Sequence, residues 1–487
     1  MFLLTKEGDE LAIVFSPEEK IRIGDTLLVD GIVVQVMDMQ FADLPGVLEH
    51  ILRKSLISKA EVKEDIQPEV RSVIDLLTDQ KLAIAKIRGR IIEEDDQKGQ
   101  KKRVFKTGLS EFNLSRAKAD IKPMDQNQLF ESLGLRFQDS VDLCRTLSVE
   151  AKGFDILAER LGINLVTGMK GSGKSYFAKR LLLRLIERGV LTLVFDLNGE
   201  YVNLWKDTLG KPNEYATRIR VMTPYIRKAR MNEMPLLIPL NEISYDDFAH
   251  FMSVQSGTPS YQSLVQFWLL RKDTIFDLND LEDYLTAPDN VKNEAVRIAL
   301  EERVKTAKAL GLFGPCDLLG TIKGLQERGG ALIFNLSLIR PWERGIIVDF
   351  VLRKLSQLGH SKEIRAVSLF LEEAQLYISQ ENMVNVLTRM RHFGIFPTFI
   401  TNDPRTLPDE VFTLLDNLVA FMFRNEDELR HLTKTGLTDE RTAYALKNLE
   451  SKQCLVVGNV SSNYPVFVEV RPQSEVMMGG ETRKLIE

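Results

Sequence analysis

A phosphate-binding loop is the clearest chemical pattern in the sequence. The pattern G-x-x-x-x-G-K-[ST] begins at Gly168 and ends at Ser175. In such a loop the backbone N–H groups surround phosphate oxygens, the lysine reaches the β and γ phosphates, and the hydroxyl group binds Mg²⁺. We therefore expect the chain to bind a nucleoside triphosphate here. The residues of this expected site are Gly168, Met169, Lys170, Gly171, Ser172, Gly173, Lys174, Ser175 and Tyr176.

The chain on either side of the loop predicts the elements that must hold it. An apolar run over 163–166 indicates a buried strand. Apolar residues then recur at helical spacing from Lys174 to Arg188, and Gly189 stops the helix. Because the N-terminus of a helix carries a partial positive charge, it favours a bound anion. The order of strand, loop and helix is the context that phosphate binding needs.

Acidic residues follow two more predicted strands. One strand ends at Asp196, with Glu200 four residues later, and the other, over 366–371, is followed directly by Glu372 and Glu373. In an open α/β sheet, ligands bind outside the carboxyl ends of the strands. Paired acids after an apolar strand are typical of a Walker B motif, in which one carboxylate orients hydrated Mg²⁺ and the other polarises the attacking water. We expect these acids to lie beside the phosphate loop.

Composition limits the class of protein. The 487 residues carry a net charge of −5 and a pI of about 5.8, so no overall basic character points to nucleic acid. A ring can still confine positive charge to a channel. Three well-separated cysteines argue for a reducing compartment and against a zinc site or a disulfide framework. With neither a signal peptide nor an apolar run of about 18 residues, we expect a cytoplasmic protein of two or three domains without a membrane span.

Changes in residue periodicity predict the domains. Short β-branched runs, two of them joined at Asp30-Gly31, predict a small β-barrel, and helical spacing interrupts it over 43–80. The charged stretch from Glu93 to Lys106 fits either a solvated hairpin or a nucleic-acid contact. The expected organisation is a β-barrel with a helical insertion over 1–110, a connector over 111–150, the first part of an α/β core over 151–239, an α-helical insertion over 240–328, the second part of the core with a C-terminal hairpin over 329–471, and a mobile tail over 472–487.

Five motifs together resemble the HerA ATPases of the HerA/FtsK group. The resemblance covers essentially the whole chain. It implies an α/β fold in which a RecA-like P-loop NTPase core follows an N-terminal β-barrel and is split by the α-helical insertion. The motifs, in the family's order, are Gly168 to Ser175, Asp196-x-x-Gly199-Glu200-Tyr201, Glu372-Glu373-Ala374, Arg391-x-Phe393-Gly394, and Pro404 through Leu407-Pro408.

The resemblance implies a homohexameric, ATP-driven translocase or helicase with double-stranded DNA in its central channel. Such proteins work with a nuclease, NurA in DNA-end resection or other effectors in anti-phage systems. ATP and Mg²⁺ are the implied ligands, with Asp196 and Glu200 beside the nucleotide. The implied roles are phosphate and Mg²⁺ binding by Lys174 and Ser175, metal-side acid for Glu372, catalytic base for Glu373 with Glu200 as the competing candidate, γ-phosphate sensor for Asn402, and completion of a neighbour's site by Arg391, with Arg389 and Arg405 as alternatives.

Three places depart from the family's usual pattern. Lys170 stands where a threonine is usual, which adds a positive charge to the phosphate loop. Gln375 stands where a histidine is usual. The usual Ser-Gln-Arg-Pro is replaced by the segment 401–404, Thr-Asn-Asp-Pro, which shortens the sensor amide and adds an acid. These changes bear on the rate of hydrolysis and on its coupling to DNA rather than on ATP binding.

Two functions from different classes follow from these patterns. The first is a DNA motor that contacts phosphates without sequence preference, for which the basic stretch over 227–230 is a candidate and a solvated helix face the equal alternative. The second is a ring-shaped scaffold that holds and regulates a nuclease and uses ATP for assembly. A small-molecule kinase is disfavoured because the insertion and barrel suit a ring better than a lid. DNA stimulation of hydrolysis separates the first two, since only a motor requires it.

Overall fold

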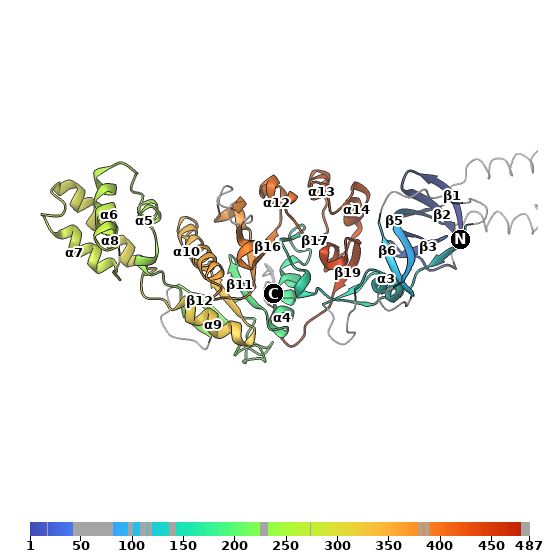
Figure 1. Cartoon of the computed structure of the whole chain (residues 1–487), viewed down its shortest axis with the longest axis horizontal. Helices are drawn as coiled ribbons and strands as arrows, with labels where there is room; N and C mark the ends of the chain where they lie inside the picture. Colours follow the sequence, from blue (N-terminus) through green and yellow to red (C-terminus); the bar gives the residue numbers. More distant parts are fainter. Residues whose placement is uncertain are drawn as a thin grey trace, which may run out of the picture. The chain divides into compact units, whose positions relative to one another are not determined.

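The computed structural model describes most of the chain as two compact units. The described residues are 1–16, 18–41, 81–95, 101–107, 114, 119–135, 143–224, 232–272, 274–378, 383–384 and 389–478. Unit 1 comprises Met1–Asp155 with Leu437–Arg471, and unit 2 comprises Ile156–Gly436 with Pro472–Glu487 (Figure 1). Each unit thus joins two separate stretches of chain, whereas the sequence predicts that 437–471 belongs with the nucleotide-binding core. The predicted helices over 43–80 and the basic stretch over 227–230 lie outside the described residues.

An antiparallel sheet holds the core of unit 1. Its strands follow the order β1-β2-β5-β4-β3-β7, and β6 pairs with β5. Asp30 (φ 49°) and Gly31 (φ 84°) both adopt the left-handed backbone that a two-residue turn between β3 and β4 requires. Strands β1 and β7 lie at opposite edges of the sheet and do not pair with each other in the described residues. The predicted barrel is therefore an open half-barrel. The strands are β1 (Phe2–Glu7), β2 (Glu10–Phe15), β3 (Thr26–Val29), β4 (Ile32–Phe41), β5 (Lys81–Asp95), β6 (Lys101–Lys106) and β7 (Ile121–Pro123).

The described parts of the charged stretch, 93–95 and 101–106, lie on the paired strands β5 and β6. Its acidic strand faces its basic strand, with Glu93 opposite Arg103 and Asp95 opposite Lys101. The Lys101 ammonium lies 3.5 Å from the Glu93 carboxylate, and Lys106 pairs with Glu94. Opposite charges across a strand pair stabilise the hairpin and neutralise one another. This arrangement favours the solvated hairpin over the nucleic-acid contact.

The segment 437–471 packs on this sheet from the other end of the chain. The Tyr464 hydroxyl lies 2.7 Å from Thr26 Oγ1, and Gln35 Nε2 donates to the carbonyl of Pro465 at 2.8 Å. The segment also adds strands to the antiparallel series β18-β19-β8-β9. The elements involved are α14 (Glu440–Ala445), β18 (Gln453–Gly458), β19 (Val466–Val470), β8 (Cys144–Thr146) and β9 (Gly153–Phe154), and unit 1 also contains α3 (Gln126–Ser132).

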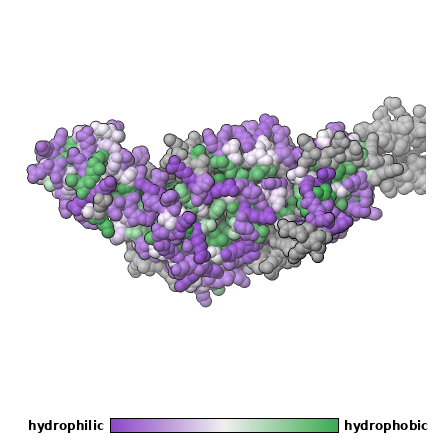
Figure 2. Space-filling model, in the orientation of Figure 1, coloured by the Kyte–Doolittle hydropathy of each residue, from purple (hydrophilic) through white to green (hydrophobic). Residues whose placement is uncertain are grey.

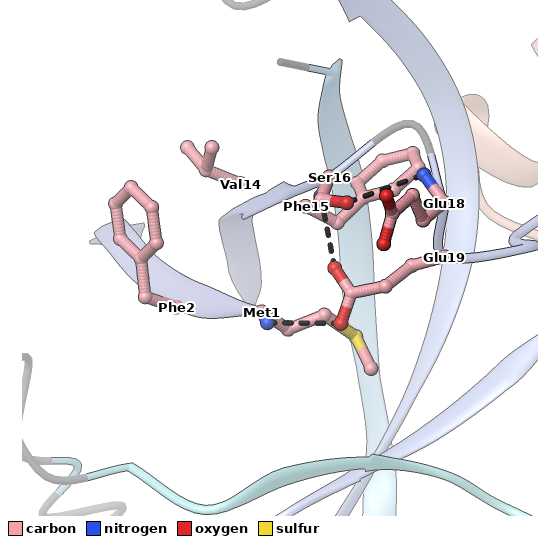
Figure 3. Close-up of a pocket in the computed structure, with 7 residues that line it drawn as sticks. All are labelled: Met1, Phe2, Val14, Phe15, Ser16, Glu18 and Glu19. Carbon is pink, nitrogen blue, oxygen red and sulfur yellow. Dashed lines mark hydrogen bonds and ion pairs between the residues drawn. The ribbon is translucent and has the colours of Figure 1, made fainter. Parts of the chain in front are cut away.

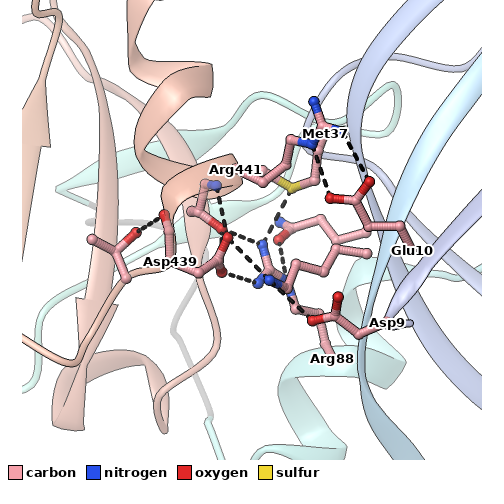
Figure 4. Close-up of polar contacts among 10 residues, drawn as sticks. Asp9, Glu10, Met37, Arg88, Asp439 and Arg441 are labelled. Carbon is pink, nitrogen blue, oxygen red and sulfur yellow. Dashed lines mark hydrogen bonds and ion pairs between the residues drawn. The ribbon is translucent and has the colours of Figure 1, made fainter. Parts of the chain in front are cut away.

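A network of charged residues ties the same segment to the half-barrel (Figure 4). Arg88 of β5 donates to Asp439 Oδ2 at 3.0 Å and to Thr442 Oγ1 at 2.8 Å. Arg441 donates to both carboxylate oxygens of Glu10, at 2.9 Å each. The Arg88 side chain is only 8% exposed, so its bonds to Asp439 are charge-assisted and largely shielded from water. Residues 437–471 are therefore an integral part of unit 1.

A parallel sheet runs through unit 2 in the order β13-β12-β14-β11-β15-β16-β10-β17. Most of its strands are buried along their whole length, as in a parallel sheet covered on both faces. Helix α4 (Lys174–Glu187) contacts β10, β11 and β16, and α10 (Pro341–His360) packs against β16. The strands are β10 (Asn164–Thr167), β11 (Leu191–Asp196), β12 (Ile219–Thr223), β13 (Glu233–Pro235), β14 (Ala331–Asn335), β15 (Val367–Glu372), β16 (Ile395–Thr401) and β17 (Asn417–Phe421).

Between β13 and β14 the described residues form the helices α5 to α9. Side chains at their N-caps, such as Ser244 and Thr258, accept bonds from backbone N–H groups of the first turn. An aromatic cluster that includes Phe248, Phe267 and Trp268 packs between them. Apolar surface is visible on these helices in Figure 2. The helices are α5 (Tyr245–Phe251), α6 (Pro259–Leu270), α7 (Leu278–Thr286), α8 (Glu294–Leu310) and α9 (Leu318–Arg328), and unit 2 also contains α12 (Asp409–Thr413) and α13 (Glu426–Thr433).

The first part of the predicted tail is packed rather than mobile. Within 472–478, Val476 is 2% exposed and Met478 is 8% exposed. The backbone N–H of Gln473 donates to the Tyr176 hydroxyl at 2.6 Å. Arg180 donates to the side-chain carbonyl of Gln473 at 2.8 Å. The segment therefore lies along α4, and the rest of the predicted tail, 479–487, is outside the described residues. None of the helices described has the length and apolar character needed to cross a membrane.

Candidate nucleotide-binding and hydrolysis site

The phosphate loop connects β10 to α4 and has the backbone that its glycines allow. Gly168 (φ 147°), Gly171 (φ 82°) and Gly173 (φ 118°) all have positive φ, a region that other residues rarely adopt. A Cβ atom at Gly168 would also lie 2.6 Å from Cβ of Phe421, at the end of β17. The N–H of Met169 donates to the carbonyl of Met422 at 2.9 Å. The loop is thus fixed between β10 and the end of β17, at the carboxyl edge of the sheet.

Lys174 spans the loop and reaches the end of β16. Its ammonium donates to the carbonyls of Gly168 (2.7 Å) and Met169 (2.9 Å) and to Asn402 Oδ1 (2.7 Å). Burial lowers the pKa of Lys174 to about 8, although nearby carboxylates, Glu373 first, oppose that shift. The two residues expected to read the phosphates, Lys174 and Asn402, are therefore in direct contact.

Glu373 is held in an unusual backbone conformation beside them. Its φ of 45° places it in the left-handed region, and its N–H donates to the carbonyl of Ile400 at 2.8 Å. Oε1 accepts from the backbone N–H (3.1 Å) and the side-chain amide (2.5 Å) of Asn402. Oε2 accepts from Gln375 Nε2 (2.7 Å) and Thr401 Oγ1 (2.9 Å). The sequence places Glu373 in the site, but the contacts with Gln375 and Thr401 come from the structure alone.

Two further acids lie at the ends of adjacent strands. Asp196 and Glu372 follow residues that are paired in the β11–β15 ladder, and both are almost fully buried. Burial raises the pKa of Asp196 to about 6, against bonds donated by the backbone N–H groups of Tyr201 and Glu200. Burial, with the neighbouring carboxylates of Asp196 and Glu200, also raises the pKa of Glu372. Glu372 and Glu200 lie close enough to Lys174 to act on its charge, although the described residues form no group of three or more potential metal ligands.

Lys179 is a site residue that the sequence analysis misses. It lies on α4 one turn beyond Ser175, is 1% exposed, and forms an ion pair with Glu200 at 3.2 Å. Position 179 lies between buried positions of this helix. A lysine on the buried face is the feature of the sequence that could have indicated a site residue. Glu200 thus neutralises this buried ammonium, whereas the four hydrogen-bond donors to Glu373 are uncharged.

Several polar atoms around the loop have no hydrogen-bond partner within the described residues. They are buried oxygens, which suits a site that receives further donors and acceptors with its ligand. Hydrated Mg²⁺ and phosphate groups fit this chemistry, because Mg²⁺ prefers oxygen ligands and keeps several waters. Ser175, in the first turn of α4, and Glu372, at the end of β15, are the residues that would hold the ion. The unpartnered atoms are Thr167 Oγ1, Ser172 Oγ and Glu372 Oε2.

The three candidate arginines lie apart from this cluster. Arg391 is 59% exposed and pairs with Asp416, while Arg405 makes two bonds to Asp403 (2.9 and 2.8 Å). Arg389 is exposed and has no hydrogen bond or ion pair with another described residue. The structure brings Lys174, Glu372, Glu373, Asn402 and Asp196 together at one edge of unit 2, and it does not bring these arginines to them.

A cavity elsewhere lacks the chemistry of this site. It has a volume of about 520 Å³ and lies beside β1 and β2 of unit 1, where Figure 3 shows Phe2 and Glu19 among its lining residues. Glu19 accepts from the N-terminal ammonium of Met1 (3.0 Å) and the backbone N–H of Ser16 (2.9 Å). Its carboxylate is therefore engaged in holding β1 rather than free for a ligand.

Comparison with known proteins shows similarity to HerA over part of the chain. The model of the central domain of the helicase HerA matches residues 164–355, from β10 into α10. A curated relative from Saccharolobus solfataricus, described as a DNA double-strand break repair helicase HerA, is 21% identical over 366 residues, 69% of this chain and 68% of the relative. Residues 164–355 of this chain are therefore similar to the HerA central domain. The HerA relative of Sulfolobus acidocaldarius, with the same description, is 21% identical over 341 residues, 62% of this chain and 63% of its own length.

The HerA match leaves part of both chains uncovered. This chain spans about two thirds of the length of these HerA relatives. Solved structures are similar at a lower level. VirB4 of Thermoanaerobacter pseudethanolicus has a TM-score of 0.47 at 14% identity, covering 69% of this chain and 98% of that one. The bacterial conjugative coupling protein TrwBdeltaN70 has a TM-score of 0.45 at 14% identity, covering 64% of this chain and 86% of that one.

Proposed function

We propose that this chain is an ATP-driven motor that translocates along or unwinds double-stranded DNA as a homohexameric ring, with the DNA in its central channel and a nuclease as its partner. The observation that carries the proposal is the match of the HerA central domain to residues 164–355, the region that holds the phosphate loop and Asp196. The curated relatives described as DNA double-strand break repair helicases point to the same substrate. DNA-end resection and anti-phage defence are the two settings in which such a motor serves a nuclease.

The residues at the carboxyl edge of unit 2 supply the roles that hydrolysis needs. Lys174 binds the β and γ phosphates, and Ser175 with Glu372 holds hydrated Mg²⁺, which supplies positive charge to the phosphate oxygens. Glu373 accepts the proton of the attacking water. Asn402 senses the γ phosphate. Each of these roles is a proposal for this chain.

The proposal of a ring rests on a positive charge that the site of one subunit lacks. Phosphoryl transfer gains a factor of about 10³–10⁵ from an arginine that stabilises the transition state. Lys174 is occupied with the loop, and Lys179 is paired with Glu200. Arg391 is exposed and lies outside its own subunit's cluster of site residues. We propose that Arg391 completes the site of the neighbouring subunit.

The decisive measurement is ATP hydrolysis with and without double-stranded DNA, together with displacement of a bound third strand as a readout of movement. A motor hydrolyses ATP faster when DNA is present and displaces the strand only when ATP is hydrolysed. Lys174→Ala is the control that separates hydrolysis by this protein from a contaminant. ATP hydrolysis that ignores DNA, with no strand displacement, would contradict the motor.

That contrary outcome describes the alternative function, a ring scaffold that assembles and regulates a nuclease. A scaffold needs ATP for assembly, so nuclease binding would depend on ATP binding and not on hydrolysis. Comparing a co-purifying nuclease in Lys174→Ala and Glu373→Gln proteins tests this, because the first variant loses phosphate contacts and the second loses only the base. The nuclease retained by Glu373→Gln and lost by Lys174→Ala would support the scaffold.

A further inference from the structure

Hydrogen-bond donors occupy all the acceptor sites of the Glu373 carboxylate. Two donors from Asn402 reach Oε1, and Gln375 and Thr401 reach Oε2, all at 2.5 to 3.1 Å. An ionised carboxylate offers about four lone-pair sites, so these four donors use them all. A general base must accept a proton from a water within hydrogen-bond reach. In this arrangement Glu373 has no lone pair left for that water.

The Lys174 ammonium is saturated in the same way. An ammonium group has three protons to donate, and its partners are the carbonyls of Gly168 and Met169 and the side-chain oxygen of Asn402. Phosphate oxygens bound in the loop need those same protons. A triphosphate therefore has to take Lys174 from at least one of its present partners.

Asn402 connects the two saturated groups. Its Oδ1 accepts from Lys174 at 2.7 Å, while its Nδ2 donates to Glu373 at 2.5 Å. Because the amide is planar, one orientation of the side chain makes both bonds. Loss of the Lys174 bond removes half of what fixes that orientation. Gln375 and Thr401, in contrast, contact Glu373 without contacting Lys174.

We propose that Asn402 is a latch that keeps Glu373 from acting as a base until a triphosphate withdraws Lys174 from it. When Lys174 turns to the phosphates, the amide of Asn402 is free to rotate, and its NH₂ group leaves Glu373. Glu373 then gains a free lone pair at the time when the γ phosphate is in place. Asn402 is thus a positioning residue that reports the triphosphate indirectly, through Lys174. The inference rests on the proposed function only in taking Glu373 as the base.

Three variants separate the two bonds of the latch. Asn402→Ala removes both bonds, and Asn402→Asp keeps an acceptor for Lys174 while losing the donor to Glu373. Gln375→Leu is the matched control, since it removes one donor from Glu373 and makes no contact with Lys174. Asn402 is exposed, so its variants should fold as the parent does, and thermal unfolding of each protein checks this.

Binding of a non-hydrolysable ATP analogue, without DNA, gives the first readout. Freed of one charge-assisted competitor for Lys174, Asn402→Ala should bind the analogue up to about tenfold more tightly than the parent. Asn402→Asp should bind it more weakly, because a carboxylate holds the ammonium more firmly. Gln375→Leu should match the parent. Unchanged or weaker binding by Asn402→Ala would overturn the latch and indicate a direct contact of Asn402 with the γ phosphate.

Single-turnover hydrolysis of prebound ATP, started with Mg²⁺ and without DNA, gives the second readout. Under the latch, Asn402→Ala hydrolyses prebound ATP faster than the parent, because Glu373 loses a competing donor. An equal or slower chemical step in this variant would overturn the proposal. Both readouts use ATP alone. If DNA did not change the rate of ATP hydrolysis by the parent, the motor function would be contradicted. The test of the latch would still be valid.

Discussion

Arg391 and Asp416 form an ion pair in which Nη1 of the guanidinium lies 3.6 Å from Oδ1 of the carboxylate. The arginine is 59% exposed, whereas Asp416 is 14% exposed and also accepts from the N–H of Ile163 at 2.9 Å. An exposed pair of this length contributes at most about 1 kcal/mol, so Arg391 can leave it at little cost. Arg405 is held by Asp403 through two bonds. Of these two arginines, Arg391 is the easier to present to a neighbouring subunit.

The first prediction tests this sharing of the site. Lys174→Ala and Arg391→Ala proteins should each lack ATP hydrolysis, and a mixture of the two should recover part of it. Recovery is expected because some interfaces in a mixed ring combine an intact loop with an intact arginine. Mixing Lys174→Ala with Arg405→Ala subunits provides the matched comparison. If demonstrated exchange of subunits restored no activity, Arg391 would not act across the interface.

The second prediction concerns Lys174 alone. Lys174→Ala should reduce ATP hydrolysis by at least about a hundredfold, because it removes a charge aimed at the phosphates. Its three hydrogen-bond partners are two carbonyls of the loop and the exposed Asn402, so the sheet of unit 2 loses no packing. Thermal unfolding of the variant should stay close to that of the parent. Turnover at the parent rate would refute the assignment of the phosphate loop.

The third prediction separates the two candidate bases. Glu373→Gln should bind ATP and lose hydrolysis, since the amide keeps the shape but cannot accept the proton. Glu200→Gln should instead lower stability, by about 1–3 kcal/mol, because it removes the carboxylate that forms an ion pair with the buried ammonium of Lys179. Single-turnover kinetics and calorimetry on both variants measure the two effects. Loss of turnover in Glu200→Gln with normal turnover in Glu373→Gln would exchange the roles.

The fourth prediction concerns Asp439 in unit 1. Burial alone would raise the pKa of Asp439, but Arg88, Thr442 and Lys86 hold it well below its usual value. A carboxyl group whose pKa falls on folding stabilises the folded state above its unfolded value of about 3.9, and that contribution is lost as the pH falls below it. Asp439→Asn should therefore lower the stability of unit 1 by about 2 kcal/mol at pH 7.

Calorimetry of parent and variant between pH 3 and pH 7 measures this difference. The gap between the two unfolding curves should narrow as the pH falls below about 4, because the unfolded parent then binds a proton at Asp439 that the folded parent does not. Arg88→Met offers a matched variant on the other side of the pair, with a similar length and no charge. A gap that stayed constant across this range would show that Asp439 acts through packing rather than through its charge.

The sequence predicts the parts of the site that depend on local pattern. The phosphate loop with its strand and helix, and the acids at 196, 372 and 373, follow from residue types over short stretches. The contact of Lys174 with Asn402 joins residues 228 positions apart, and no pattern in either segment specifies it. Nor does any local rule give Glu373 its left-handed backbone. The structure supplies these relationships because they arise from the register of separate strands.

The division into units shows the same limit. The strands of 437–471 are predicted from their apolar runs, but their partners are not. These strands belong to unit 1 because side chains such as Arg88 and Gln35 form hydrogen bonds with residues hundreds of positions later in the chain. Likewise, Val476 and Met478 are too few apolar residues to predict a packed segment from sequence. Their burial depends on bonds that Gln473 makes to α4.

The discontinuity of unit 1 has a consequence for the order of synthesis. Its first stretch ends at Asp155, and its second begins at Leu437, about 280 residues later. At roughly 5–20 residues per second, a ribosome needs about 14–56 s to cover that interval. During this time Arg88 has been synthesised but its counter-charge at Asp439 has not. The surface of the sheet that residues 437–471 later cover is still exposed to solvent. A nascent chain that pauses within this interval is therefore the form of the protein most exposed to aggregation and to capture by chaperones.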